Sequence, residues 1–240
     1  GGLVDLTPVA DLPIAIVFMV QGGSEGGNAL ADVLSGRKNF CGRLVDSWPM
    51  NYVQIPDGEN FSSLNGDLEN EYYTEGCYVG YRYFDSFGVA PRFPFGFGLS
   101  YTTFAQTVTA VTLDGKTLTA RVQVTNTGKV PGREVVQGYL HIPGSVAQSL
   151  TAFAKTPVLT AGESCETTLT INLADNAVYS EENARWELPQ GEYRLYIGKN
   201  SRDTVTAAAL TLAETVTVKQ CRTCCKTSNA LQEIEAPAQA

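Results

Sequence analysis

Residues 71–104 read EYYTEGCYVGYRYFDSFGVAPRFPFGFGLSYTTF, and this stretch constrains the fold more than any other part of the chain. Tyrosines and phenylalanines crowd both sides of Gly88, while further glycines, Pro91 and Pro94 interrupt the run. Because proline breaks helices and glycine weakens strands, neither a helix nor a simple strand is expected here. We expect an irregular segment that contacts among its aromatic rings hold in one shape.

Length and charge narrow the possible partners. The chain has 240 residues, enough for one large or two medium domains, and its net charge of −8 offers no basic surface for nucleic acid. No apolar run approaches the ~20 residues that span a bilayer, so no membrane partner is expected. The opening at Gly1, without an initiator methionine, indicates a fragment. We expect a soluble protein, with the cytoplasm favoured over secretion.

The cysteines raise the possibility of a metal site. Cys221, Cys224 and Cys225 form a CxxCC group, but His141 is the only histidine and no second CxxC pair exists. A tetrahedral zinc site needs four ligands, so a reduced, incidental cluster is favoured over zinc. No metal and no cofactor are expected.

The first part of the chain is typical of an α/β protein. Residues 13–20 (PIAIVFMV) form a nearly continuous apolar run, as in a strand that is covered on both faces. Four glycines then predict a tight loop, and Asn28 is the expected N-cap of a helix over 29–34. Strand, glycine loop and helix make one unit of a parallel sheet. Residues 1–105 are therefore expected to be an incomplete α/β sandwich domain.

From about residue 106 the hydrophobic period changes to two. Asp114-Gly115 predicts a hairpin and Asn126-Thr127-Gly128 predicts the next turn. Trp186 and Tyr193 are expected in the core, and the predicted strands include 118–124, 134–142, 165–173, 192–198 and 204–212. Short strands at this spacing predict an immunoglobulin-like β-sandwich over 106–218. Residues 219–240 are expected to be a linker or tail.

One short motif favours a different chemistry. Residues 22–26 (GGSEG) match the G-x-S-x-G pattern of a serine nucleophile between a strand and a helix. Ser24 would then need His141 as its base. His141 lies in a predicted strand of the second domain and not on a loop at the end of the parallel sheet. A serine esterase is therefore the lesser alternative, and a tight turn explains the glycines.

Motifs along nearly the whole chain resemble glycoside hydrolase family 3. In the aromatic stretch the resemblance lies in 75–76, 78–79, 81–85, 93–96 and 98–104. Upstream, residues 23 and 25–29 are similar to the family's Gly-x-Glu-Gly-Gly-Asn-Ala stretch, although Gly22 and Ser24 depart from it. Further motifs similar to those of the family lie at 39–49, 124–128, 132–139, 150–155 and 159–164. Phe40 and Ser47 depart from the first of these motifs, and Thr151 and Ala152 depart from the one at 150–155.

The resemblance implies an incomplete α/β sandwich domain followed by a fibronectin type III-like domain. It also implies a retaining mechanism, with an aspartate nucleophile from a TIM-like barrel and a glutamate acid/base that often comes from the α/β sandwich. Neither motif occurs in this sequence, so no residue is assigned a catalytic role. The implied partners are a β-linked glucoside or oligosaccharide and the missing barrel of the same protein. Some relatives carry the barrel last, and the polar end of this chain would suit a linker to it.

Within that frame a few side chains are candidates for a site. Phe61, Tyr72 and Tyr73 have polar, loop-like surroundings and are the expected sugar contacts, because pyranose faces stack on aromatic rings. Glu75 and Asp85 are expected in a structural network with Arg82, which could form an ion pair or a cation–π contact.

The sequence thus favours a fragment of a β-glucosidase-like enzyme that lacks its barrel. A stand-alone carbohydrate-binding or scaffolding module is the alternative, and the flanking sequence would distinguish the two.

Overall fold

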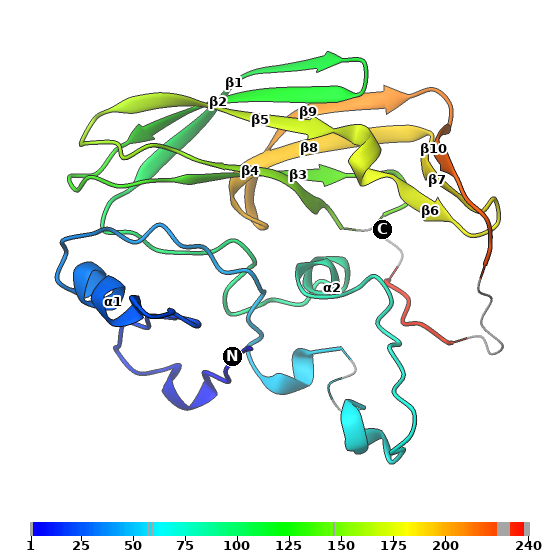
Figure 1. Ribbon diagram of the computed structural model, residues 1–240, viewed down its shortest axis with the longest axis horizontal. Helices are drawn as coiled ribbons and strands as arrows, with labels where there is room; N and C mark the ends of the chain where they lie inside the picture. The colour runs from blue at the N-terminus through cyan, green and yellow to red at the C-terminus, as the bar shows by residue number, and fades with distance from the viewer. Residues whose placement is uncertain (1, 57, 59, 146, 225–230, 238–240) are drawn as a thin grey trace.

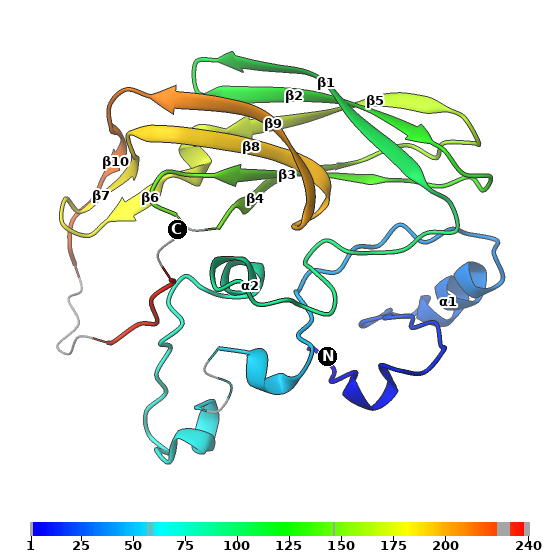
Figure 2. The same cartoon turned by 180° about the vertical axis from the view of Figure 1, so that it is seen from behind.

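The chain folds into two parts. The computed structural model describes residues 2–56, 58, 60–145, 147–224 and 231–237. A β-sandwich forms one side of the molecule, and an irregular N-terminal region with short helices lies against it (Figure 1). The view from behind shows the same two parts (Figure 2). The predicted class, a partial α/β region followed by an all-β sandwich, is confirmed.

Antiparallel strands make up the second part. One sheet has the order β1-β2-β5, a second has β4-β3-β8-β9, and a small third sheet has β10-β7-β6. The bounds are β1 Phe104–Asp114, β2 Thr117–Asn126, β3 Val135–His141, β4 Ser149–Lys155, β5 Ser164–Asn172, β6 Val178–Ser180, β7 Arg185–Leu188, β8 Gly191–Asn200, β9 Asp203–Leu212 and β10 Val216–Gln220.

The expected hairpin joins β1 to β2. Asp114 pairs with Thr117, so the two-residue loop is Gly115-Lys116, and Gly115 takes the positive φ of 58° that such turns need. Along β2 every second residue is buried, as the sequence pattern predicts. Strand β3 is buried at six consecutive positions, because β4 and β8 flank it and both of its faces are covered.

The core lies between the two larger sheets. Tyr193 is fully buried there, as predicted. Trp186 is exposed, and its predicted place in the core is wrong: it lies in β7 of the small third sheet, and only Leu188, at the end of that strand, reaches the core. The buried residues of this core come from both large sheets, from their connections and from the end of β7: Phe104, Leu118, Ala120, Val122, Val124, Val136, Leu140, Ile142, Leu159, Leu169, Ile171, Leu173, Leu188, Tyr193, Leu195 and Ile197.

The predicted strand at residues 13–20 does not form. This segment is extended but unpaired among the described residues, and its side chains are exposed. A strand needs a neighbour to accept its backbone hydrogen bonds, and the described part of the chain offers none here. The segment makes one aromatic contact: the Phe18 ring packs edge-on against the buried Trp48, with 5.0 Å between the ring centroids.

Two helical details also differ from expectation. Helix α1 spans Gly26–Leu34, so Asn28 lies inside it and Glu25 is the N-cap residue; the Asn28 side chain donates to the Glu25 carboxylate. Within the aromatic stretch, Tyr81–Ser86 form helix α2 between Gly80 and Gly88. These six residues contain no glycine or proline, and they suffice for a short helix. The frequent glycines and prolines of the segment as a whole led to the prediction that no helix forms there.

The tail begins later than expected. Strand β10 runs to Gln220 and pairs with β7, so Lys219 and Gln220 belong to the sheet. Further on, the Ile234 amide donates to the Thr74 carbonyl, which brings residues near the C-terminus to the N-terminal region. None of the described helices is long and apolar enough to cross a membrane.

A buried ion pair joins the two parts. The Arg43 guanidinium contacts the Glu134 carboxylate, and their side chains are only 11% and 4% exposed. The same carboxylate accepts from the Val135 amide, and the Glu134 amide donates to the Thr156 hydroxyl. Glu134 is therefore held by both parts of the molecule at the start of β3.

Gln137 makes a second connection from β3. Its amide nitrogen donates to the carbonyls of Gly96 and Lys199 at 3.1 and 2.5 Å, and its oxygen accepts from the Tyr139 hydroxyl at 2.6 Å. A Cβ at residue 96 would lie 2.1 Å from the Gln137 side-chain oxygen, and Gly96 has φ of 82°. The glycine is required there for both reasons.

We expect the sandwich to fold by itself and the N-terminal region not to. The strand bounds indicate 103–221 as the independent piece, because β1 begins at Phe104 and β10 ends at Gln220. Expressed alone, 103–221 should melt cooperatively, and 1–102 should give a poorly dispersed amide spectrum because few of its apolar residues are buried. Cooperative melting of 1–102 would show that this region has a core of its own.

Glu134→Ala should be strongly destabilising. It leaves the Arg43 guanidinium buried without its partner, and such losses cost about 3–5 kcal/mol of unfolding free energy. Glu166→Ala is the matched control, because the Arg121–Glu166 pair is exposed and should contribute at most about 1 kcal/mol. Urea denaturation of both variants measures the difference, and equal losses would refute the special role of the buried pair.

Stability should fall at alkaline pH. Burial raises the pKa of Tyr193 to about 12 and raises the pKa of Tyr139 further, whereas an unfolded tyrosine titrates near about 10. The folded protein thus holds these protons more tightly, so stability is present below pH ~10 and is lost progressively above it. Urea denaturation at several pH values should show a shallower decline for Tyr139→Phe. An unchanged slope would mean that other groups dominate.

Candidate functional site

The three predicted sugar contacts lie on one exposed loop region. Phe61, Tyr72 and Tyr73 are all exposed, and the chain around residues 60–70 (cyan in Figure 1) runs on the far side of the N-terminal region from the sandwich. Between them Asp67 forms a tight turn, because its carboxylate accepts from the Asn70 side chain and from the amides of Glu69 and Asn70. These hydrogen bonds, and above all the one from the Asn70 side chain, lower the pKa of Asp67. Sugar binding by the three rings stays a prediction.

Aromatic contacts hold α2 against the sandwich. The Tyr81 ring lies 4.7 Å from that of Phe95 and 6.2 Å from that of the buried Tyr139, measured between centroids. The Tyr81 hydroxyl also accepts from the Leu150 amide at the start of β4. Elsewhere in the segment, Phe93 stacks on Phe97 at 5.1 Å. The aromatic residues of the segment therefore pack as rings in an irregular backbone, as the sequence indicates.

The predicted network around Arg82 is only partly as expected. Arg82 lies over the Tyr81 ring at 5.6 Å, a cation–π distance, and donates to the Ser149 hydroxyl. Asp85 pairs instead with Arg202, whose Nε lies 2.7 Å from the carboxylate. Burial raises the pKa of Asp85, against the opposing effect of the Arg202 charge. Glu75 is half-buried in a turn, where its carbonyl accepts from the Tyr78 amide.

Sequence reasoning missed the cation that pairs with Asp85, which is Arg202 at the tip of the β8–β9 hairpin. Arg202 also donates to the carbonyls of Phe84 and Val89, and the Ser201 amide donates to the Phe95 carbonyl. No local sequence signal marks Arg202, since it lies in an ordinary polar turn. Glu134 and Gln137 did carry a signal, because Glu134 directly precedes the mostly apolar strand β3 and Gln137 lies within it.

The serine esterase alternative lacks its geometry. Ser24 is exposed in the turn before α1, whereas His141 ends β3 in the sandwich. Nδ1 of His141 has no hydrogen-bond partner among the described residues, so no acid orients the imidazole as a catalytic triad requires.

The described residues assemble no metal site. They contain no group of three or more His, Cys, Asp or Glu that could hold an ion. Cys221 and Cys224 are described with free thiols, and Cys225 lies outside the described residues. Asp85 is half-buried, but its bond to Arg202 makes it a structural contact and not a free acid or base.

Comparison with known proteins explains this arrangement. Residues 1–101 match the Glycosyl hydrolase family 3 C-terminal domain, and residues 134–201 match the Fibronectin type III-like domain. Beta-glucosidase A of Butyrivibrio fibrisolvens is 39% identical over 85% of this chain, and an exo-alpha-(1->6)-L-arabinopyranosidase of Bifidobacterium breve is 37% identical over 91%. In each case the chain spans 28% of the relative's length.

The solved structures agree with the sequence relatives. Beta-glucosidase 3B of Thermotoga neapolitana, solved in complex with alpha-D-glucose, superposes with a TM-score of 0.82 at 36% identity, over 90% of this chain and 30% of that one. That match extends over both the N-terminal region and the sandwich, and in this chain the C-terminal domain match precedes the fibronectin type III-like match. The chain therefore belongs to glycoside hydrolase family 3, with the family's C-terminal domain region followed by its fibronectin type III-like domain.

Proposed function

We propose that this chain serves a β-glucosidase-like hydrolase whose catalytic barrel lies in another part of the same protein. The observation that carries the proposal is the pattern of coverage: the chain aligns over most of its own length with several beta-glucosidases but spans only 24–29% of theirs. The retaining chemistry of such an enzyme needs two carboxylates, and neither of the family's catalytic motifs occurs in this sequence. The chemistry then belongs to the remainder, and this chain contributes support and binding surface.

The exposed apolar segment supports the same proposal. Residues 13–20 leave Ile14, Ile16 and Val17 exposed, and among the described residues no strand pairs with this segment. Such a segment is stabilised when it adds to a sheet that covers both of its faces. In the longer protein we assign it to a strand of the α/β sandwich domain, next to strands that precede this chain. The division of the chain into an α/β sandwich region, a fibronectin type III-like sandwich and a tail belongs to this proposal, with the limits of the sandwich moved to Phe104 and Gln220 by its first and last strands.

The aromatic loop gives the chain a direct part in binding. Phe61, Tyr72 and Tyr73 are exposed, and each offers apolar ring surface in a loop-rich segment that also holds the polar turn at Asp67. We assign to them a contact with the sugar of a β-linked glucoside or oligosaccharide. The substrate is left open between a glucoside and an arabinopyranoside, since relatives of both names match this chain at similar identity.

The protein with its barrel should hydrolyse p-nitrophenyl β-D-glucopyranoside, and the chain 1–240 alone should not exceed background. Within the longer protein, Tyr72→Ala and Tyr73→Ala should each raise KM several-fold, because a lost ring–sugar contact costs about 1 kcal/mol. Tyr179→Ala is the control, since Tyr179 is similarly exposed on the sandwich.

Each result bears on a separate part of the proposal. Turnover by purified 1–240 would refute the need for a barrel. Faster hydrolysis of p-nitrophenyl α-L-arabinopyranoside would replace the glucosidase assignment. Unchanged KM in both tyrosine variants would remove the aromatic loop from the substrate site.

A further inference from the structure

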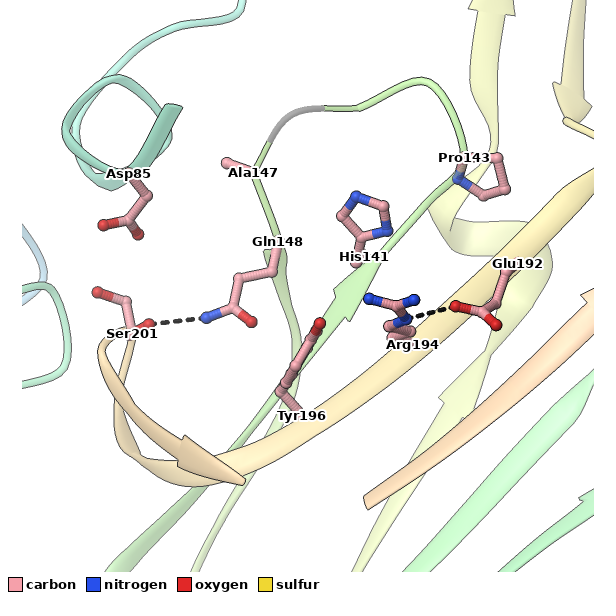
Figure 3. Close-up of a pocket in the computed structure, with 9 residues that line it drawn as sticks. All are labelled: Asp85, His141, Pro143, Ala147, Gln148, Glu192, Arg194, Tyr196 and Ser201. Carbon is pink, nitrogen blue, oxygen red and sulfur yellow. Dashed lines mark hydrogen bonds and ion pairs between the residues drawn. The ribbon is translucent and has the colours of Figure 1, made fainter. Parts of the chain in front are cut away.

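A polar pocket of about 540 Å³ lies where α2 meets the sandwich. Its lining side chains come from α2, β3, β8 and the two connections beside them (Figure 3). That volume falls within the roughly 300–1,000 Å³ range of small-molecule sites. The lining residues are Asp85, His141, Pro143, Ala147, Gln148, Glu192, Arg194, Tyr196 and Ser201.

Three polar atoms of these residues have no partner in the described part of the chain. They are the Ser201 hydroxyl, the second carboxylate oxygen of Asp85 and Nδ1 of His141, and each is buried as an atom. Ser201 as a residue is only 3% exposed. A buried polar group without a hydrogen bond costs about 1–3 kcal/mol, so three beside one pocket call for a ligand that satisfies them.

The unpaired atoms of Ser201 and Asp85 are not the atoms through which these residues bind the rest of the protein. Gln148 donates to the Ser201 carbonyl at 2.7 Å, and the dashed line in Figure 3 marks this bond. That bond fixes the Ser201 backbone and leaves its hydroxyl unused. Arg202 likewise binds Oδ1 of Asp85 and leaves Oδ2 unused. The fold thus holds both residues in place through other atoms.

The charges indicate the class of ligand. Asp85 pairs with Arg202, and Glu192 pairs with Arg194, so the ionised groups at the pocket are balanced. Balanced charges give no surplus with which to bind an anion or a cation. What remains is a serine hydroxyl, a carboxylate oxygen, an imidazole nitrogen and the ring of Tyr196, whose hydroxyl is already bound to Arg194. Hydroxyl groups, which both donate and accept, match that set.

We propose that this pocket binds a neutral polyhydroxylated ligand, a saccharide of one or two units. The Ser201 hydroxyl and Oδ2 of Asp85 bind its hydroxyl groups, and Tyr196 offers a ring to its apolar face. The ligand can be a free monosaccharide or the end of an oligosaccharide, and the two share this chemistry. The proposal concerns residues of this chain alone, so it stands or falls independently of the proposed hydrolysis.

The test is an NMR titration of ¹⁵N-labelled 1–240 with D-glucose, with cellotetraose and with inorganic phosphate. Saturable shifts at the amides of Gln148, Tyr196 and Ser201 are expected with D-glucose, with Kd of roughly 1–10 mM. Tighter binding of cellotetraose would assign the site to oligosaccharide ends, and equal or weaker binding would assign it to free sugars. Saturable shifts with neither sugar would overturn the proposal, as would a site that prefers phosphate.

Ser201→Ala provides the decisive variant. It removes a hydroxyl that has no partner in the chain, so the melting temperature should stay the same or rise, while Kd should increase about three- to tenfold. The control is Ser164→Ala, because Ser164 is exposed on β5 and lies outside the pocket. Unchanged Kd in Ser201→Ala would refute the assignment. If that variant does not fold, Asp85→Asn keeps an acceptor for Arg202 and alters the other oxygen, and it must weaken glucose binding likewise.

Discussion

The orientation of this molecule depends on polar groups that are buried between its two parts. Arg43 and Glu134 are taken almost entirely out of water, and two charges in that position are tolerated only if they meet each other and find further hydrogen bonds. Glu134 meets both conditions, through Arg43 and through the Val135 amide. Because a shifted arrangement would leave one charge buried alone, the pair specifies a single docking of the irregular region on the sandwich. Gln137 adds the same kind of constraint three residues along β3.

The sandwich could be predicted from sequence because its signals are local. Alternation along β2, the turn at Gly115 and the apolar run of β3 each depend on a few neighbouring residues. The helix at Tyr81–Ser86 was missed, because six residues are too few for a periodic pattern to emerge. Trp186 was misplaced in the core since hydrophobicity alone does not tell which sheet a short strand joins.

The candidate site was less predictable because its contacts are distant in sequence. Arg202 lies more than one hundred positions from Asp85, and nothing beside either residue marks the pair. Residues 13–20 carry the pattern of a covered strand, yet a strand exists only together with a neighbour. The apolar sequence pattern therefore indicates a strand that is covered on both faces, whereas the described residues supply no neighbouring strand to cover it. Family membership reconciles these two observations, since the relatives are three to four times as long.

The turn of the β8–β9 hairpin limits which changes of length this molecule tolerates. It offers Ser201 and Arg202 to α2 and to the aromatic segment, and it is so tight that a Cβ on Gly198 would lie 1.9 Å from the Asp203 carbonyl oxygen. The same two residues join β8 to β9 and set their register, since Asn200 pairs with Asp203. An insertion there would disturb the hairpin and would also move Ser201 and Arg202 away from the groups that they bind in the N-terminal region. The length of this surface loop is thus constrained twice, by its own sheet and by the neighbouring domain.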